Sequence, residues 1–410
     1  MGRRVSSRRL PTRPAVACAA RSLSAVTTLS VLSALSVLSI LSVLSVSPAR
    51  AASAADVLPR QPPPGMSAVG GARLALSGVQ ADPGGAPPPP ESSALAWMVS
   101  DGDTGQVLAA KNAHWPLPPA STLKTLFADT LLPRLAADTV HRVSTADLRG
   151  LGTGSSLVGI QAGQSYKVSD LWLGVLLCSG NDAVHTLAAM SGGIPATVGA
   201  MQERATALGA HDTHVVSPDG YDAPGQLSSA YDLTLFLRDA LTNPDFTRYS
   251  ATRVARFPGG RNAEGAATPS FQIQNTNRLL AGTDGVARYP GLIAGKNGYT
   301  AQAGNTLVSA ASQGGHTLIV ALLNPRSGKT NAVYDETRRL LDWGFAARSR
   351  VTAVGALADP PGGPAGGGTG ADPPGRIWPA VGWAAAVVLP AVGWAVVCLR
   401  RGRGRGRGRG

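Results

Sequence analysis

The stretch Pro118-Pro-Ala-Ser-Thr-Leu-Lys124 decides how the fold of this 410-residue chain is interpreted. Its two prolines stop any preceding helix, so a new helix begins near Ser121, and the side chains of Ser121 and Lys124 lie on one face of it. A serine hydroxyl is a poor nucleophile until a base takes its proton. A lysine can be that base when burial and nearby positive charge lower its pKa. Taken alone, the spacing also fits a helix-capping serine beside a solvated lysine.

Two further segments combine polar side chains with predicted helices or strands. Cys178-Ser-Gly-Asn-Asp182 ends one apolar run with helical spacing and starts another. Gly295-Lys-Asn-Gly-Tyr-Thr300 lies on a predicted strand.

The pattern of apolar residues predicts an α/β (α+β) architecture. Helical spacing extends over residues 120–137, 168–190, 230–241 and 330–345. A hairpin is predicted for residues 94–100 and 106–110, and an antiparallel meander for residues 292–298, 306–311 and 317–323. Strands at both ends of the folded segment and helices between them predict a sheet that is completed from both ends of the chain.

The three polar segments resemble the Ser-x-x-Lys, Ser-x-Asn and Lys-Thr-Gly motifs of serine penicillin-binding proteins and β-lactamases. Longer blocks narrow the resemblance to the D-alanyl-D-alanine carboxypeptidase family of low-molecular-mass penicillin-binding proteins, over about residues 90–350. These blocks include Asp103-Thr-Gly-Gln-Val-Leu108, Gly220-Tyr-Asp-Ala-Pro-Gly225, Asn275-Thr-Asn-Arg-Leu-Leu280 and Leu341-Asp-Trp-Gly-Phe345.

The resemblance implies a penicillin-binding/β-lactamase-like transpeptidase fold, an antiparallel sheet flanked by helices plus a helical lobe. It also implies a serine-type D-Ala-D-Ala carboxypeptidase that trims the terminal D-alanine from peptidoglycan stem peptides through an acyl-enzyme. β-Lactams are then expected as covalent inhibitors. No cofactor and no metal are expected, because the sequence has no Cys/His cluster at metal-ligand spacing.

Site roles follow from the resemblance position by position. Ser121 matches the nucleophile, Lys124 the base, and Ser179 the hydroxyl that relays a proton toward the leaving amine. The backbone N–H groups of Ser121 and Tyr299 match an oxyanion hole. The positions that match substrate-binding residues are Asn181, Lys296, Asn297, Gly298 and Tyr299, with Lys296 also expected to lower the pKa of the other lysine.

One position departs from the family pattern. Asn297 stands where the family has Thr or Ser, and its amide can donate a hydrogen bond to a carboxylate but is bulkier and cannot relay a proton. No clear partner arginine for the substrate carboxylate is evident, although Arg326 and Lys329 lie on a loop after a predicted strand. The alternative is therefore a catalytically weak penicillin- or peptidoglycan-binding protein of the same fold.

A Ser-His-Asp hydrolase is disfavoured. The sequence has no Gly-x-Ser-x-Gly segment, and its six histidines lie in predicted loops or on helix surfaces, where they are expected to be structural or solvated.

Charge is concentrated at the two ends of the chain. The formal net charge is +13, but residues 1–51 hold seven arginines and residues 377–410 hold six, with no acidic residue in either segment. The remainder has 24 basic and 24 acidic residues, so no nucleic-acid partner is expected. Basic ends next to apolar segments indicate membrane targeting instead.

The predicted organisation has six segments. Residues 1–51 have the charged, apolar and small-residue regions of a signal peptide, with an uncleaved anchor as the alternative. Residues 377–399 form an uncharged segment that as a helix extends about 35 Å, enough to span a membrane. Pro/Gly-rich linkers are predicted at 52–93 and 351–376, the peptidase domain at 94–350, and a cytoplasmic Arg-Gly tail at 400–410. This order places the domain outside the cell membrane.

Overall fold

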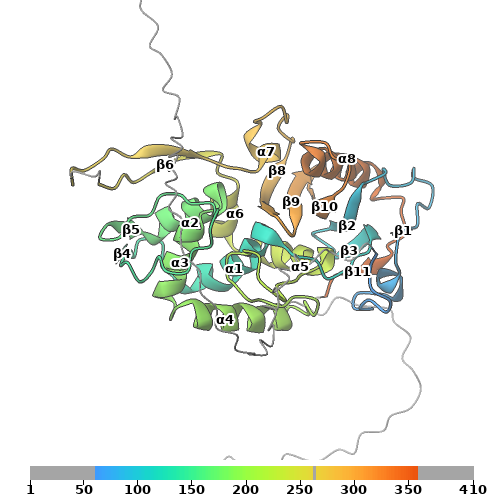
Figure 1. Ribbon diagram of the computed structural model, residues 1–410. Helices are drawn as coiled ribbons and strands as arrows, with labels where there is room; N and C mark the ends of the chain where they lie inside the picture. The colour runs from blue at the N-terminus through green and yellow to red at the C-terminus, as the bar shows by residue number, and fades with distance from the viewer. Residues whose placement is uncertain (1–60, 262–264, 359–410) are drawn as a thin grey trace, which may run out of the picture. The chain divides into compact units, whose positions relative to one another are not determined.

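A seven-stranded antiparallel sheet is the framework of residues 61–261 and 265–358, the part of the chain that the computed structural model describes (Figure 1). Its order is β1-β3-β2-β10-β9-β8, and β11 also pairs with β3. The strands are β1 (Val79–Ala81), β2 (Ala94–Asp101), β3 (Gln106–Lys111), β8 (Leu292–Thr300), β9 (Gly304–Gln313), β10 (His316–Pro325) and β11 (Gly355–Ala356).

The hairpin and the meander that the sequence predicts are both present. β2 pairs with β3, and β8, β9 and β10 pair in succession. The two units are joined by β10 against β2, with Val320 opposite Val99. The sheet is therefore completed from both ends of the folded segment, as expected.

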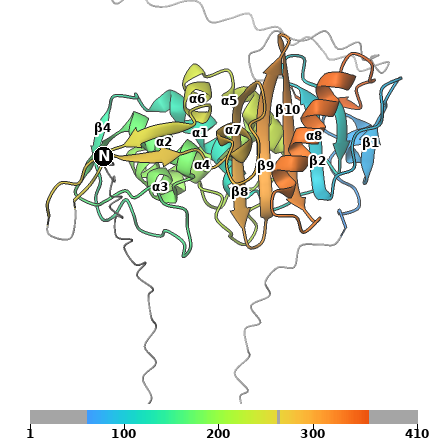
Figure 2. The ribbon, with the colours of Figure 1, turned by 90° about the horizontal axis from the view of Figure 1, so that it is seen from above.

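Side chains of the central strands alternate between two apolar layers. On β10, Leu318, Val320 and Leu322 pack on one face, while the residues between them pack on the other. Helix α8 (Ala332–Ala347) covers the first face, as Figure 2 shows. Helix α5 (Ala230–Ala240) contacts the opposite face of β10 and β2. Because both faces are covered, β10 is apolar almost throughout its length.

A helical region is inserted between β3 and β8, and it supplies the first two polar segments singled out above, while the third lies on β8 itself. The run predicted at residues 120–137 is shorter and divided, because Pro133 lacks the N–H that a continuing helix needs. The run at 168–190 breaks at Ser179, which has a left-handed φ of 59°. The elements are η2 (Ala120–Leu123), α1 (Lys124–Leu131), η3 (Leu132–Arg134), β4 (Val140–Arg142), β5 (Ser165–Lys167), α2 (Val168–Cys178), α3 (Asn181–Met190), α4 (Ile194–Ala207), α6 (Pro244–Ser250), β6 (Val254–Phe257), β7 (Phe271–Gln274) and α7 (Arg278–Ala281).

The linker prediction for residues 52–93 is corrected for residues 61–93, which are part of the folded body. They contain η1 (Ala72–Ala75), whose Leu74 is fully buried, and strand β1 at the edge of the sheet. Ser93 donates hydrogen bonds to Glu336 of α8 through both its backbone N–H and its hydroxyl. Edge strands attach through backbone hydrogen bonds, so a composition poor in large apolar residues does not exclude them.

The folded body also extends past its predicted end at residue 350, since β11 pairs with β3.

A buried polar cluster connects the N-terminal part of the body to the rest. His114 donates from Nε2 to the carbonyl of Val69 at 2.9 Å, and its Nδ1 lies 2.6 Å from Asp212. One ring nitrogen of His114 and one carboxylate oxygen each of Asp212 and Asp232 lie within 4.8 Å of one another, so they have the spacing of metal ligands. Their positions in the sequence did not reveal this grouping.

Three predicted segments lie outside the described residues: the signal peptide at 1–51, the membrane helix at 377–399 and the tail at 400–410. Within residues 61–261 and 265–358, no helix has the length and apolar character needed to cross a membrane.

Candidate active site

Ser121 lies in η2, the helical turn that leads directly into α1. The residue before it, Ala120, has a left-handed φ of 49°, a conformation that costs an L-residue roughly 1–2 kcal/mol. The turn is held because the hydroxyls of Thr122 and Thr306 both donate to the carbonyl of Pro119, at 2.5 and 2.9 Å. Thr306 belongs to β9, so the sheet itself fixes the position of the serine.

Two glycines allow neighbouring backbone to approach this turn closely. A Cβ on Gly298 of β8 would lie 2.7 Å from the Ser121 nitrogen, and a Cβ on Gly220 would lie 2.0 Å from the Ala120 carbonyl oxygen. Neither distance is tolerable for a side chain. Gly298 thus lets β8 pass directly beside Ser121, which agrees with the expected place of an oxyanion hole between Ser121 and Tyr299.

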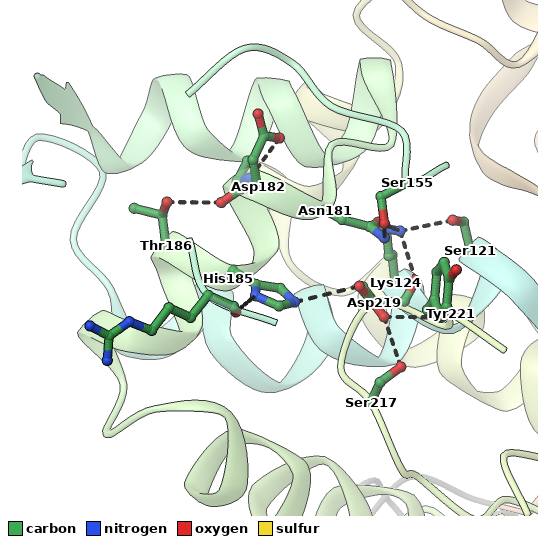
Figure 3. Close-up of polar contacts among 12 residues, drawn as sticks. Ser121, Lys124, Ser155, Asn181, Asp182, His185, Thr186, Ser217, Asp219 and Tyr221 are labelled. Carbon is green, nitrogen blue, oxygen red and sulfur yellow. Dashed lines mark hydrogen bonds and ion pairs between the residues drawn. The ribbon is translucent and has the colours of Figure 1, made fainter. Parts of the chain in front are cut away.

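The amine of Lys124 is fully buried and has three oxygen partners (Figure 3). Nζ lies 2.8 Å from Ser121 Oγ, 2.7 Å from Asn181 Oδ1 and 2.7 Å from the carbonyl oxygen of Asp219. The amide and carbonyl oxygens can only accept, so they engage two N–H groups of the amine. When Lys124 is neutral, its lone pair therefore faces the hydroxyl of Ser121.

Burial lowers the pKa of Lys124 to about 8, while the carboxylates of Asp219 and Asp182 act in the opposite direction. At pH 7 a group with that pKa is neutral in about a tenth of the molecules. Lys124 is therefore poised to serve as a base close to neutral pH, which an exposed lysine is not.

The strand lysine, Lys296, is also buried, and its Nζ donates to the carbonyl of Asn297 at 2.6 Å. Burial, and then the charge of Lys124, hold the pKa of Lys296 well below its usual range. Lys296 was expected to help lower the pKa of Lys124, but burial is the main cause of the lowered pKa, and the charges that act most on Lys124 are the carboxylates of Asp219 and Asp182, which raise it.

Asn297 is fixed by a residue that the sequence did not single out for a role. Thr276 donates from its hydroxyl to Asn297 Oδ1 at 3.0 Å. That bond uses the amide oxygen, so Nδ2 is left as the group that can donate to a carboxylate. The departure from Thr or Ser at this position is therefore accompanied by a partner that orients the amide.

Two cavities near the end of β8 share Tyr299 as a lining residue. One, of about 220 Å³, is lined by Ser121, Asn181, Tyr221 and Tyr299 among others. The second, of about 520 Å³, is lined by Asn297, Gly298 and Tyr299 and by Arg278, whose Nε lies 3.1 Å from Asp284 Oδ2. Arg278 thus lines the second cavity, whereas Arg326 and Lys329, the two residues noted from the sequence, do not.

The structure leaves the role of Ser179 as a prediction. Ser179 is buried at the break between α2 and α3, and its hydroxyl has no hydrogen-bond partner among the described residues. Asn181, two residues on, donates to Ser155 Oγ at 3.0 Å as well as accepting from Lys124.

Some residues of the site were not predicted. Ser155 comes from a loop whose only signal is its Gly/Ser-rich composition, and Asp219 contacts Lys124 through its backbone. His185, which was expected on a helix surface, is buried, with Nε2 at 3.6 Å from Asp219 Oδ2. These contacts join residues that are far apart in the chain, so local spacing does not reveal them.

Ser121 lies at a helix start beside the edge strand of an antiparallel sheet, and its hydroxyl is hydrogen-bonded to a buried lysine. These features define a serine acyl-transfer enzyme with the fold of penicillin-binding proteins. The sequence model of the peptidase S11 family, described as D-alanyl-D-alanine carboxypeptidase, matches residues 84–327. The chain belongs to this family.

Similar proteins agree with this assignment. The chain is 39% identical over 278 residues to the D-alanyl-D-alanine carboxypeptidase DacB2 of Mycobacterium tuberculosis, covering 67% of this chain and 90% of that protein. It is 35% identical over 272 residues to DacD of Salmonella typhimurium, covering 63% of this chain and 64% of that protein. The chain therefore spans less than two thirds of the second relative.

Solved structures show the same fold. A penicillin-binding protein homologue from Mycobacterium tuberculosis has a TM-score of 0.60 at 38% identity, covering 67% of this chain and all of that one. The Streptomyces K15 DD-transpeptidase has a TM-score of 0.58 at 27% identity, covering 63% of this chain and all of that one.

Proposed function

We propose that the protein is a serine-type D-Ala-D-Ala carboxypeptidase that removes the terminal D-alanine from peptidoglycan stem peptides, with Ser121 as its nucleophile. Membership of the D-alanyl-D-alanine carboxypeptidase family supports the activity. The observation that carries the assignment of the nucleophile is the 2.8 Å bond between Ser121 Oγ and the buried amine of Lys124. β-Lactams acylate the same serine in this proposal and act as covalent inhibitors.

The proposed reaction begins at the hydroxyl of Ser121. Neutral Lys124 takes the hydroxyl proton while Oγ attacks the carbonyl carbon of the penultimate residue. The resulting oxyanion is bound by the backbone N–H groups of Ser121 and Tyr299. The amide bond then breaks, the proton is passed to the leaving amine of D-alanine, with Ser179 as the relay, and water later hydrolyses the ester. Nδ2 of Asn297 donates to the terminal carboxylate of the substrate.

The purified full chain distinguishes this activity from the alternative of a weak binder. We expect a fluorescent penicillin to label the protein covalently and a D-Ala-D-Ala peptide to release D-alanine in a separate incubation. Covalent label without measurable D-alanine release would identify the catalytically weak penicillin-binding protein. Absence of both would overturn the proposed function.

We also propose that the protein is exported and held by its C-terminal segment, with the catalytic domain outside the cell membrane. Support comes from the sequence: an Arg-rich start before an apolar segment, and the uncharged residues 377–399 followed directly by an Arg-Gly tail. The substrate class agrees, because peptidoglycan lies outside the membrane. Residues 52–60 and 359–376 would then connect the domain to its flanking segments.

Protease treatment of intact cells with a permeabilised wall tests this topology. We expect digestion of the domain at residues 61–358 and protection of an epitope placed after residue 410, because arginine-rich flanks stay in the cytoplasm. A cytoplasmic marker protein serves as the control for membrane integrity. Protection of the domain with loss of the epitope would reverse the orientation.

A further inference from the structure

The loop that carries Asp219 is pressed against the nucleophile turn. The carbonyl of Asp219 accepts from Lys124 Nζ at 2.7 Å, and the adjacent Gly220 approaches the Ala120 carbonyl so closely that no side chain fits there. The carboxylate of the same residue is buried. Asp219 thus contacts the amine through its backbone carbonyl, and its carboxylate acts on the charge of the same amine.

The Asp219 carboxylate is held from three directions (Figure 3). It accepts from Ser217 Oγ at 2.7 Å and from the Tyr221 N–H at 2.9 Å, and His185 Nε2 of α3 lies 3.6 Å away. His185 Nδ1 lies 3.0 Å from the carbonyl of Arg149, which can only accept, so that nitrogen carries the hydrogen and fixes the ring. These contacts and the charge of Lys124 hold the pKa of Asp219 well below its usual range despite its burial, which keeps the group ionised.

Other charges near Lys124 come from different elements. Lys296 of β8 is a second buried amine, and Asp182 at the start of α3 is a second carboxylate. Asp182 accepts from the backbone N–H groups of Val158, Gly159 and Ile160 at 2.8–3.0 Å, and these donors disperse its charge. Asp219 is therefore the carboxylate with the strongest effect on the amine.

We propose that Asp219 is a positioning residue for the base: its backbone carbonyl orients the Lys124 amine toward Ser121, and its carboxylate sets the pH above which Lys124 can accept a proton. The proposal rests on the proposed roles of Ser121 and Lys124. Its physical basis is that a buried negative charge stabilises the ammonium form over the neutral amine.

The sign of the effect follows directly. The Asp219 carboxylate raises the pKa of Lys124 while burial lowers it, and the balance is about 8. Asp219→Asn keeps the backbone carbonyl but removes the charge, so Lys124 becomes neutral at lower pH. We expect the acid limb of the acylation rate to move down by about one pH unit. The plateau should fall modestly, because a less basic amine takes the proton less readily.

The experiment measures the rate of acylation of the full chain by a fluorescent penicillin from pH 5 to 9. Asp219→Glu preserves the charge and should keep the midpoint of the wild type. Asp239→Asn removes another buried carboxylate, one that pairs with Arg204, and should also keep that midpoint. A lowered plateau with an unchanged midpoint in Asp219→Asn would show that the carboxylate only braces the loop, and would overturn the proposal.

Two further measurements distinguish the effect of the Asp219 charge from a loss of folding or of turnover. Asp219→Ser is a second neutral variant, and failure of both neutral variants to fold while Asp219→Glu folds would make the carboxylate structural and overturn the proposal. If the wild-type chain forms no acyl-enzyme, the proposed function fails. The Lys124 titration, followed by the ¹⁵N shift of labelled lysine, then still compares the variants without turnover.

Discussion

Ser121→Ala is expected to abolish covalent labelling by penicillin and release of D-alanine, with rates more than about 10⁴-fold below those of the wild type. The reason is that the acyl-enzyme needs an oxygen at this position. Ser121 lies beside β8 at Gly298, and its hydroxyl is hydrogen-bonded to the amine of Lys124. Gel fluorescence and the mass of the intact protein measure the effect.

The Ser121→Ala protein should still fold. Lys124 keeps its bonds to Asn181 and to the Asp219 carbonyl, so the loss is one hydrogen bond, worth about 1 kcal/mol. Thermal unfolding followed by circular dichroism checks this control. A variant that is folded and still labelled would place the nucleophile elsewhere, with Ser179 as the next candidate.

Lys124→Met is expected to slow acylation by about 10²- to 10⁴-fold, as loss of a positioned general base does. Methionine fills much of the buried volume but offers no lone pair to Ser121. The wild-type rate should rise as the pH increases through about 8, where Lys124 loses its proton. In Lys124→Met this rise should disappear, and stopped-flow acylation over that pH range measures both effects.

Lys111→Met is the matched control for a partly buried lysine. Its Nζ donates to the carbonyl of Ala94 at 2.7 Å, within the sheet, and burial lowers its pKa too. We expect this variant to be labelled at the wild-type rate. Retention of the wild-type rate and pH profile in Lys124→Met would remove Lys124 as the base.

Much of the fold is predictable because its signals are local. Short β-like runs separated by turn residues, in the residue 94–110 hairpin and the 292–323 meander, indicate strands that pair with their neighbours, and both units are present. The spacing of Ser121 and Lys124 likewise predicts their contact, since both lie on one helical turn.

Predictions from the sequence were weaker where a segment is attached to the sheet by backbone hydrogen bonds rather than by apolar side chains. Residues 61–93 have the composition of a linker, yet β1 pairs with β3 and Leu74 is fully buried. Asn297 was recognised as a departure from the family, but its bond to Thr276 was not expected. An amide's partner is set by whichever strand or loop lies alongside it.

By itself the sequence determined the family, the order of the hairpin, the central helices and the meander, and the pairing of Ser121 with Lys124. Only the tertiary structure decided what surrounds the amine of that lysine and lowers its pKa. Its other two partners, Asn181 and Asp219, are 57 and 95 positions away in the chain, and the imidazole facing Asp219 is that of His185, from the same helix as Asn181. A lysine's pKa depends on burial and on charges near it in space, and neither is a property of its neighbours in sequence.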